Sequence, residues 1–186
     1  MKVLGISGSM RRDSHNTKLL RAAAELLPPG AELELWEGLK AVPPYDDDDH
    51  YKDEPRPWIL RSLAGAIEEA DVVLFATPEY NHSVPGQLKN ALDWLSRPLA
   101  ASPLRNKPVA VVGASTGLFG AVWAQAELRK VLSAIGARVI DRELPVGLAG
   151  DAFTDEGRLA DAEQELVLAD LLAELLGEAV TTPVPA

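Results

Sequence analysis

The sequence predicts a single α/β domain built around a doubly wound parallel β-sheet. Two observations predict it. Five short segments of strand character alternate with five segments of helical character. Two of the strands, 71–76 and 107–114, are apolar almost throughout, as strands covered by helices on both faces are. With 186 residues, 47% of them hydrophobic, the chain has the size of one domain and can bury a full core.

The elements follow one another in a regular order along the chain. A strand at 2–6 leads into a polar turn, 7–16, and a helix at 17–27, which Pro28-Pro29-Gly30 ends. The other strands are expected at 31–36, 71–76, 107–114 and 137–140. The other helices are expected at 56–69, 86–95, 121–135 and 159–176. An irregular excursion at 37–56 interrupts the alternation, and the tail, 178–186, is expected to be frayed.

Composition excludes several classes of function. A net charge of −10 disfavours binding to nucleic acid or to an anionic membrane. The absence of cysteine excludes disulfides, thiolate metal sites and cysteine nucleophiles. No apolar run approaches the roughly 18 residues of a membrane span, and the N-terminus lacks a signal core, so a cytoplasmic location is expected. No metal site is expected either, because the histidines lack ligand spacing and Asp46–Asp49 suit a solvated acidic loop.

The turn after the first strand carries the donors that a phosphate group needs. It opens a helix, whose N-terminus offers backbone N–H groups and a positive partial charge. An ordinary strand–turn–helix connection needs only one capping residue, whereas this turn holds many donors. They are the hydroxyls of Ser9, Ser14 and Thr17, the amide of Asn16 and the guanidinium of Arg11. The turn lacks Gly-x-Gly-x-x-Gly and the Gly-Lys-Ser/Thr of a P-loop, so the sequence predicts a phosphate site without a dinucleotide fingerprint.

Two more loops are expected at the same edge of the sheet, beyond the carboxyl ends of the strands, where ligands bind in such folds. The loop 77–86 is stiffened by two prolines and presents Asn81 and Tyr80. Its chemistry suits the polar edge of a flavin ring, but a merely structural loop fits the residues equally well. The loop 115–120 has glycines that permit close backbone approach, or simply a flexible connection. No Gly-x-Ser-x-Gly elbow occurs there.

Together these loops resemble the NADPH-dependent FMN reductase family, which includes quinone, azo and chromate reductases. The resemblance runs from Lys2 to about Leu176. It rests on Gly8-Ser9-x-Arg11-x-x-Ser14-x-Asn16-Thr17, on Thr77-Pro78-Glu79-Tyr80-Asn81-His82-Ser83-Val84-Pro85-Gly86 and on the following Leu88-Lys89-Asn90-Ala91-Leu92-Asp93-Trp94. It continues in Ala124-Gln125-x-x-Leu128-Arg129. The resemblance implies a flavodoxin-like fold of strand order 2-1-3-4-5, forming one domain over residues 1–186.

The resemblance also implies a cofactor and its binding residues. The FMN phosphate would be bound by Ser9, Arg11, Ser14, Asn16 and Thr17. The isoalloxazine ring would be lined by Pro78, Glu79, Tyr80, Asn81, Ser115 and Gly117. Relatives often carry a glycine pair where this chain has Gly120-Ala121. NADPH or NADH would be the co-substrate, and the family is usually dimeric or tetrameric, with the flavin near a subunit interface.

The expected activity is a ping-pong oxidoreductase in which hydride passes from NAD(P)H to FMN and on to a small-molecule acceptor. That acceptor would be a quinone, an azo compound, a metal oxyanion or free flavin. Because the cofactor supplies the chemistry, no catalytic side chain is assigned, and none of the histidines is given a role. Two alternatives remain. One is an electron-carrier flavodoxin without nicotinamide turnover, and the other is a flavin-bound redox sensor that recruits a partner through residues 46–57 and Trp58.

Overall fold

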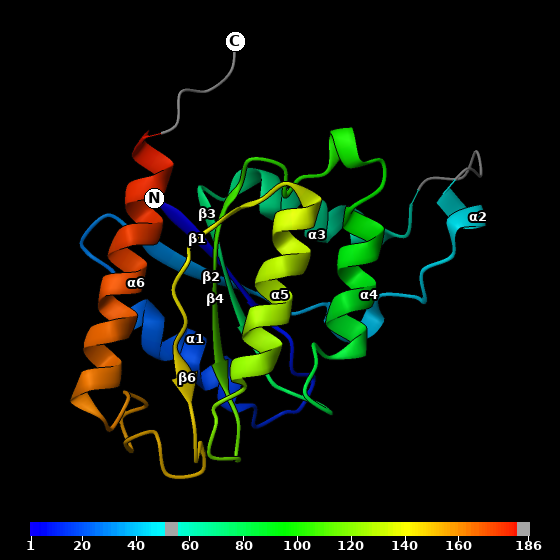
Figure 1. Ribbon diagram of the computed structural model, residues 1–186. Coiled ribbons are helices and arrows are strands. Elements are labelled where there is room, and N and C mark those ends of the chain that lie inside the picture. Colours follow the sequence, from blue (N-terminus) through cyan, green and yellow to red (C-terminus); the bar gives the residue numbers. More distant parts are fainter. Residues whose placement is uncertain (51–55, 182–186) are drawn as a thin grey trace.

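Six strands form one parallel sheet in a computed structural model that describes residues 1–50 and 56–181 (Figure 1). The order β2-β1-β3-β4-β5, with β6 paired to β4, confirms the predicted flavodoxin-like order 2-1-3-4-5. The strands are β1 (Lys2–Ser7), β2 (Glu32–Trp36), β3 (Val72–Thr77), β4 (Pro108–Ala114), β5 (Arg138–Val139) and β6 (Pro145–Val146). β3 and β4 are buried along their whole length, as their unbroken apolar sequences predict.

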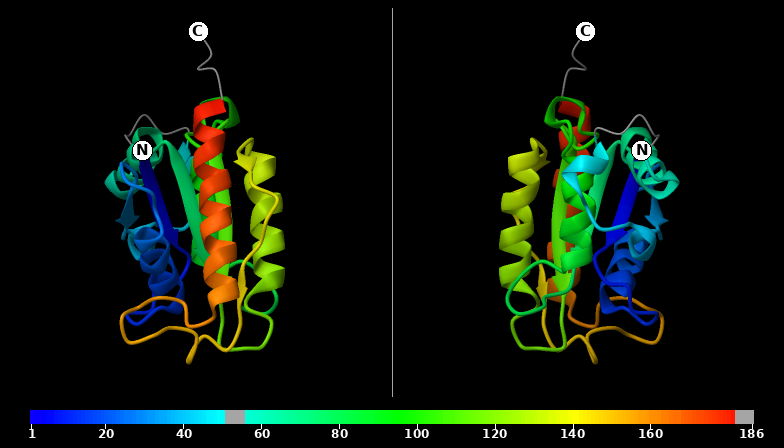
Figure 2. Two further views of the ribbon diagram at one scale, coloured as in Figure 1. Left: turned by 90° about the vertical axis from the view of Figure 1, so that its left-hand side faces the viewer. Right: turned by 90° about the vertical axis from the view of Figure 1, so that its right-hand side faces the viewer.

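Helices cover both faces of the sheet (Figure 2). The α-helices are α1 (His15–Glu25), α2 (Asp47–His50), α3 (Trp58–Glu69), α4 (Gly86–Leu95), α5 (Val122–Ile135) and α6 (Ala162–Thr181). Two short 3₁₀ turns are η1 (Leu39–Ala41) and η2 (Leu99–Ala101). α1 and α6 pack on one face with a core that includes Val3, Leu74 and Leu171. α3, α4 and α5 pack on the other face with a core that includes Phe75, Leu92 and Leu128.

The strands that pair with the outer edge of β4 differ from the prediction. The predicted last strand, 137–140, shrinks to the two residues of β5, which pair with Pro108 and Val109 at the start of β4. A further strand that the sequence pattern did not indicate, β6, pairs with Gly113 and Ala114 at the end of β4. The outer edge of β4 is therefore covered by two separate short strands.

The helices begin and end close to their predicted limits, with two corrections. α1 begins at His15 rather than at 17, because Ser14 caps it by accepting a hydrogen bond from the Thr17 N–H over 3.2 Å. α6 continues past its predicted end at 176 as far as Thr181. Residues 178–181 of the tail expected to fray are thus helical, and Glu178 forms an ion pair of 2.8 Å with Arg138. Residues 182–186 of that tail, and 51–55 of the irregular excursion, lie outside the described residues.

All the parallel strands point their carboxyl ends toward one edge of the sheet, the lower edge in Figure 1. The loops that follow β1, β3, β4 and β6 gather there. In a doubly wound sheet this edge is where ligands bind. Among the helices of the described chain, none combines the length and the apolar character that crossing a membrane requires.

Candidate functional site

A pocket of about 210 Å³ lies where the loops after β1, β3 and β4 meet. Most of the predicted site residues line it: Ser9, Arg11, Asn16, Pro78, Glu79, Tyr80 and Ser115. Its other lining residues are His15, Ala114 and Thr116. Four predicted site residues do not line it, namely Ser14, Thr17, Asn81 and Gly117. The three loops singled out from the sequence therefore converge on one site, which we call the convergent pocket.

The first loop is ordered by its own hydroxyl groups. The backbone N–H of Arg11 donates to Ser9 Oγ over 3.4 Å, and the Arg11 guanidinium donates to the Asp13 carbonyl oxygen over 2.6 Å. Ser14 is buried and its Oγ caps α1, so its oxygen is partly used within the protein. Because the first N–H groups of a helix have no intrahelical partner, the start of α1 offers donors beside the pocket.

Asn16 holds the first loop against β4. Its amide nitrogen donates to the Ala114 carbonyl oxygen, and its amide oxygen accepts from the Ala114 N–H, both over 2.9 Å. The residue is 2% exposed. The side chain, predicted as a phosphate donor, is therefore engaged by the backbone at the end of β4, and it fixes the distance between two walls of the pocket.

His15 is a pocket residue to which sequence reasoning gave no role. Its Nδ1 atom is buried and has no hydrogen-bond partner in the described structure, and its ring lies parallel to Phe153 at 6.4 Å between centroids. Burial lowers the pKa of the imidazole, and the charges of Arg11 and Lys18 lower it further. The sequence offered no signal for this burial, since Phe153 lies far along the chain. An unsatisfied buried nitrogen beside a pocket is the kind of atom that a ligand can satisfy.

The second loop makes a tight turn at its tip. Tyr80 and Ser83 exchange two backbone hydrogen bonds of 3.2 and 3.1 Å. The two residues between them, Asn81 and His82, have φ values of 53° and 60°, the left-handed conformation that such two-residue turns require. The turn places Asn81 at the tip, away from the residues that line the pocket, while Tyr80 remains on the wall.

Two carboxylates, one on the second loop and one on α5, hold the loop in place. Glu79 accepts a hydrogen bond of 3.0 Å from the Ala124 N–H in the first turn of α5, where the helix dipole favours negative charge. Glu127, further along α5, accepts from Ser83 Oγ over 2.6 Å and from the Val84 N–H over 3.3 Å. The hydroxyl of Ser83, and then the Val84 N–H, lower the pKa of Glu127. The pocket wall is thus tied to α5 at both ends of the turn.

The third loop is held by the segment after β6. The Leu148 N–H donates to the Gly117 carbonyl oxygen, and the Ala149 N–H donates to that of Ser115, both over 3.0 Å. Gly120 has a φ of 56°, and a Cβ atom there would lie 2.4 Å from the Pro145 carbonyl carbon. Relatives often carry the second glycine at the position of Ala121. Ala121 has a φ of 63°, so it adopts the left-handed conformation although it has a side chain.

Large apolar side chains stand exposed around the rim of the convergent pocket. Leu118, Phe119 and Trp123 are 69%, 59% and 43% exposed, and Tyr80 is 55% exposed. The Trp123 ring meets Phe119 edge-on at 5.1 Å and His82 edge-on at 4.6 Å. Exposed aromatic groups in one place are typical of a surface that contacts a ligand or another protein.

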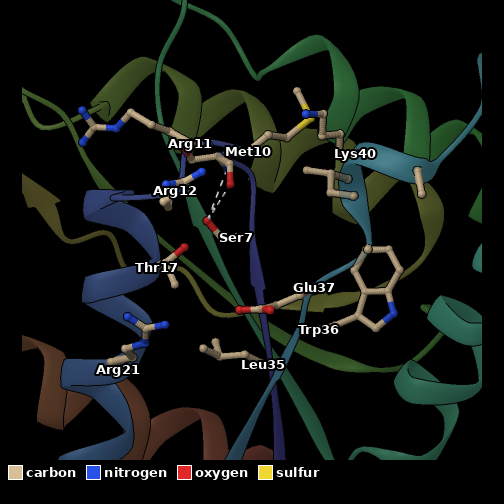
Figure 3. A pocket seen from close by; sticks show the side chains of 14 residues that line it. Ser7, Met10, Arg11, Arg12, Thr17, Arg21, Leu35, Trp36, Glu37 and Lys40 are labelled. Atoms are coloured by element: carbon tan, nitrogen blue, oxygen red, sulfur yellow. Dashed lines mark hydrogen bonds between the residues drawn. The ribbon is translucent and has the colours of Figure 1, made fainter.

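A larger pocket of about 410 Å³ lies on the other side of the first loop (Figure 3). We call it the basic pocket. It is formed by that loop, the outer side of α1 and the segment from β2 to η1. Thr17 lines this pocket rather than the convergent one, while Ser9 and Arg11 line both. No sequence pattern indicated this pocket, because its charged residues are separated along the chain and each is typical of a solvated surface.

Comparisons with known proteins identify the family of the chain. The model of the family described as NADPH-dependent FMN reductase matches residues 1–151. An NAD(P)H-dependent FMN reductase of Pseudomonas aeruginosa is 42% identical over 175 residues, covering 93% of this chain and 92% of that protein. A quinone reductase of Escherichia coli is 38% identical over 142 residues, covering 76% of this chain and 74% of that protein.

A solved structure agrees over nearly the whole chain. The flavoenzyme NAD(P)H:(acceptor) oxidoreductase FerB of Paracoccus denitrificans superposes with a TM-score of 0.82 at 32% identity. The alignment covers 96% of this chain and 97% of that one.

Proposed function

The chain belongs to the NADPH-dependent FMN reductase family and is an FMN-dependent NAD(P)H oxidoreductase, and we propose that its convergent pocket is where the flavin binds. When bound, FMN supplies the chemistry by taking hydride from NAD(P)H and passing the electrons to a small-molecule acceptor. The observation that supports this proposal most strongly is that three loops line a single pocket, although their residues, such as Ser9 and Ser115, lie far apart in the sequence.

The first loop is proposed to hold the FMN phosphate. Ser9 and Arg11 line the pocket beside the free N–H groups at the start of α1, and a phosphate dianion is stabilised by such N–H groups and by a guanidinium. His15 adds a buried ring nitrogen without a partner. Asn16 and Ser14 act mainly by fixing the shape of the loop, because their side chains already bond to Ala114 and to the Thr17 N–H.

The second and third loops are proposed to line the isoalloxazine ring. Pro78, Glu79 and Tyr80 form one wall, and Ser115 and Thr116 form the other. Asn81 and Gly117 lie on the same loops and are proposed to act through backbone shape. A pocket of about 210 Å³ is smaller than the roughly 300–1,000 Å³ of most ligand sites. The ring is therefore expected to extend onto the exposed aromatic rim.

The protein's own part in the reaction is positioning. The flavin ring can be reached by a co-substrate only if the wall at Pro78–Tyr80 stays open and fixed. Glu79 fixes it by accepting from the Ala124 N–H of α5, and Glu127 fixes it from α5 by accepting from Ser83. No side chain needs to transfer a proton for hydride to arrive, so no acid–base residue is assigned. The acceptor is proposed to be a quinone, azo compound, metal oxyanion or free flavin, taken at the same face after NAD(P)⁺ leaves.

We further propose that the protein is a homodimer or homotetramer whose contact surface includes the aromatic rim. Leu118, Phe119 and Trp123 are exposed beside the pocket, and burial of such side chains at an interface is favourable. A second subunit there would also exclude water from the flavin. Sedimentation of the FMN-loaded protein is expected to give a mass that falls when Phe119 and Trp123 are changed to serine. A monomeric wild-type protein would contradict this part.

Anaerobic stopped-flow mixing tests the proposed function. The FMN-loaded protein is mixed with NADPH while the flavin absorbance is followed. Rapid bleaching, followed by recovery of colour on addition of a quinone, is expected. Bound flavin that does not bleach on the scale of seconds would indicate an electron carrier. A protein that remains colourless after addition of FMN would refute the flavin site itself.

A further inference from the structure

The basic pocket is a second site at the same edge of the sheet, and the flavin as placed above leaves most of it free. Its residues fall into two groups that face each other (Figure 3). Arg12 and Arg21 come from the first loop and α1, and Glu37 and Lys40 come from just after β2 and from η1. A volume of about 410 Å³ falls within the roughly 300–1,000 Å³ of sites that bind small molecules.

The charge of the pocket is positive although the chain as a whole carries −10. Arg12, Arg21 and Lys40 contribute three cations against the single carboxylate of Glu37. Within residues 1–50 and 56–181, the side chains of Arg12, Arg21, Lys40 and Glu37 make no hydrogen bond and no ion pair. Several unpaired cations around one space are suited to a phosphate group.

A flat apolar wall stands beside these charges. Trp36 ends β2 and its indole Nε1 donates to Ser62 Oγ over 3.3 Å, which fixes the ring. Gly38 lies against the ring so closely that a Cβ atom there would be 2.3 Å from the Trp36 Cζ2 atom. Leu35 and Leu39 complete the wall. A fixed aromatic plane next to a phosphate site is suited to a nucleoside, whose base can lie against it.

The position of the pocket relates it to the convergent pocket. The two share Ser9 and Arg11, so they are neighbours on either side of the first loop. The basic pocket lies at the end of β2 and the convergent pocket at the ends of β1, β3 and β4, in the sheet order β2-β1-β3-β4. At about 4.8 Å per strand, these ends span roughly 10–15 Å. A dinucleotide can lie along such an edge with its two halves in different clefts.

We propose that the basic pocket binds the adenosine end of NADPH, with Arg12, Arg21 and Lys40 around the 2′-phosphate and the base against Trp36. This inference rests on the proposed function, since it presumes that the nicotinamide end reaches a flavin in the convergent pocket. Glu37 faces the same space, where it can accept a hydrogen bond from a ribose hydroxyl but opposes the phosphate. The pocket thus favours NADPH over NADH by its cations.

Kinetics of single variants test the proposal with the FMN-loaded enzyme. Arg21→Gln and Lys40→Gln each remove one cation and leave the first loop unchanged. Each is expected to lower kcat/KM for NADPH by about tenfold, with kcat/KM for NADH changing less than about twofold. Arg105→Gln, at an exposed arginine just before β4, is the matched control and should change neither. Equal losses for NADPH and NADH, or no loss for either, would overturn the proposal.

Direct binding separates this proposal from the reductase activity. Calorimetry with 2′,5′-ADP and with 5′-ADP compares nucleotides that differ by the 2′-phosphate. The wild type is expected to bind 2′,5′-ADP at least about tenfold more tightly than 5′-ADP. Arg21→Gln should remove that difference, and Glu37→Gln should increase it. No binding, or equal binding of the two nucleotides, would overturn the proposal. A protein that shows the expected binding but oxidises no NADPH would refute the proposed function and leave the nucleotide site standing.

Discussion

Asn16 and Ala114 exchange two hydrogen bonds of 2.9 Å across 98 residues of sequence. The pair joins the start of α1 to the end of β4, so it connects the loop proposed to hold the phosphate with the loop proposed to line the flavin ring. Both groups of Ala114 are backbone atoms, and Asn16 is buried. The side chain therefore completes the hydrogen bonding of a strand end that would otherwise be left without partners.

Asn16→Ala is expected to destabilise the protein and weaken FMN binding together. The change leaves the N–H and the carbonyl oxygen of Ala114 buried and unsatisfied, at a cost of about 1–3 kcal/mol for each group. Urea unfolding should show the loss in stability. Asn16→Asp keeps an acceptor for the Ala114 N–H but loses the donor, so its loss should be smaller in the acid range where the carboxyl is protonated. Equal stability of wild type and Asn16→Ala would show that the pair does not brace the site.

Arg11→Ala should weaken FMN binding with little effect on stability. The guanidinium is exposed, and among the described residues it donates only to the Asp13 carbonyl oxygen, over 2.6 Å, so the fold does not depend on it. A charge-assisted bond to phosphate contributes about 1.5–3 kcal/mol, which corresponds to roughly a 10–150-fold rise in Kd. Flavin fluorescence quenching measures it, with Arg105→Ala as control. An unchanged Kd would mean that the phosphate binds elsewhere.

Glu127→Gln is expected to flatten the acid limb of the stability profile. The hydrogen bond from Ser83 and that from the Val84 N–H hold the pKa of Glu127 below its usual range. A group with a lowered folded-state pKa adds stability above its unfolded pKa, and this contribution is lost as pH falls through the folded value. Between about pH 6 and pH 3, the wild type should therefore lose more unfolding free energy than Glu127→Gln. Parallel losses in the two proteins would contradict this role.

Changes of side chain at Gly120 and Ala121 are expected to affect stability to very different extents. Gly120→Ala puts a Cβ atom 2.4 Å from the Pro145 carbonyl carbon at a φ of 56°, and should cost about 3 kcal/mol or more. Ala121→Gly should change stability by less than about 1 kcal/mol, because relief of the left-handed conformation offsets the lost methyl burial. Thermal unfolding of both variants checks the pair. Similar losses at the two positions would contradict the assigned backbone conformations.

FMN binding should raise the pKa of His15. In the structure, burial and then the charges of Arg11 and Lys18 lower the pKa of this imidazole. A phosphate dianion beside it favours the protonated form. NMR titration of the imidazole signals with and without FMN measures the change, and His15→Phe identifies the signal. A His15 pKa that does not respond to FMN would place the phosphate away from this ring.

Periodicity and apolar runs predicted the sheet and its principal helices. The strands buried on both faces, β3 and β4, have nearly continuous apolar sequences. α1 ends at Glu25, two residues before its predicted end at 27 and ahead of the Pro28-Pro29-Gly30 segment. The short strand β6 was not predicted, because the two residues Pro145–Val146 are too few to show a periodic pattern. It exists only through pairing with Gly113 and Ala114, a contact that depends on the folded arrangement of distant segments.

The sequence predicted which loops form the site, but it did not predict what each side chain in them contacts. Asn16 carries an amide donor suited to phosphate, yet both its amide nitrogen and its amide oxygen are already hydrogen-bonded to the backbone of Ala114. In the sequence His15 resembles a surface histidine, and only the folded structure places the Phe153 ring beside it. The basic pocket needs Arg12 and Lys40, from separate segments, to face one space. Each of these features depends on tertiary contacts that local sequence does not encode.

A crystal structure of the protein with FMN tests the central claim most directly. The flavin phosphate is expected beside Ser9, Arg11 and the start of α1, with the ring between Tyr80 and Ser115. Density for the phosphate in the basic pocket, between Arg12 and Arg21, or for the ring outside the two walls formed by Pro78–Tyr80 and Ser115–Thr116, would contradict the account.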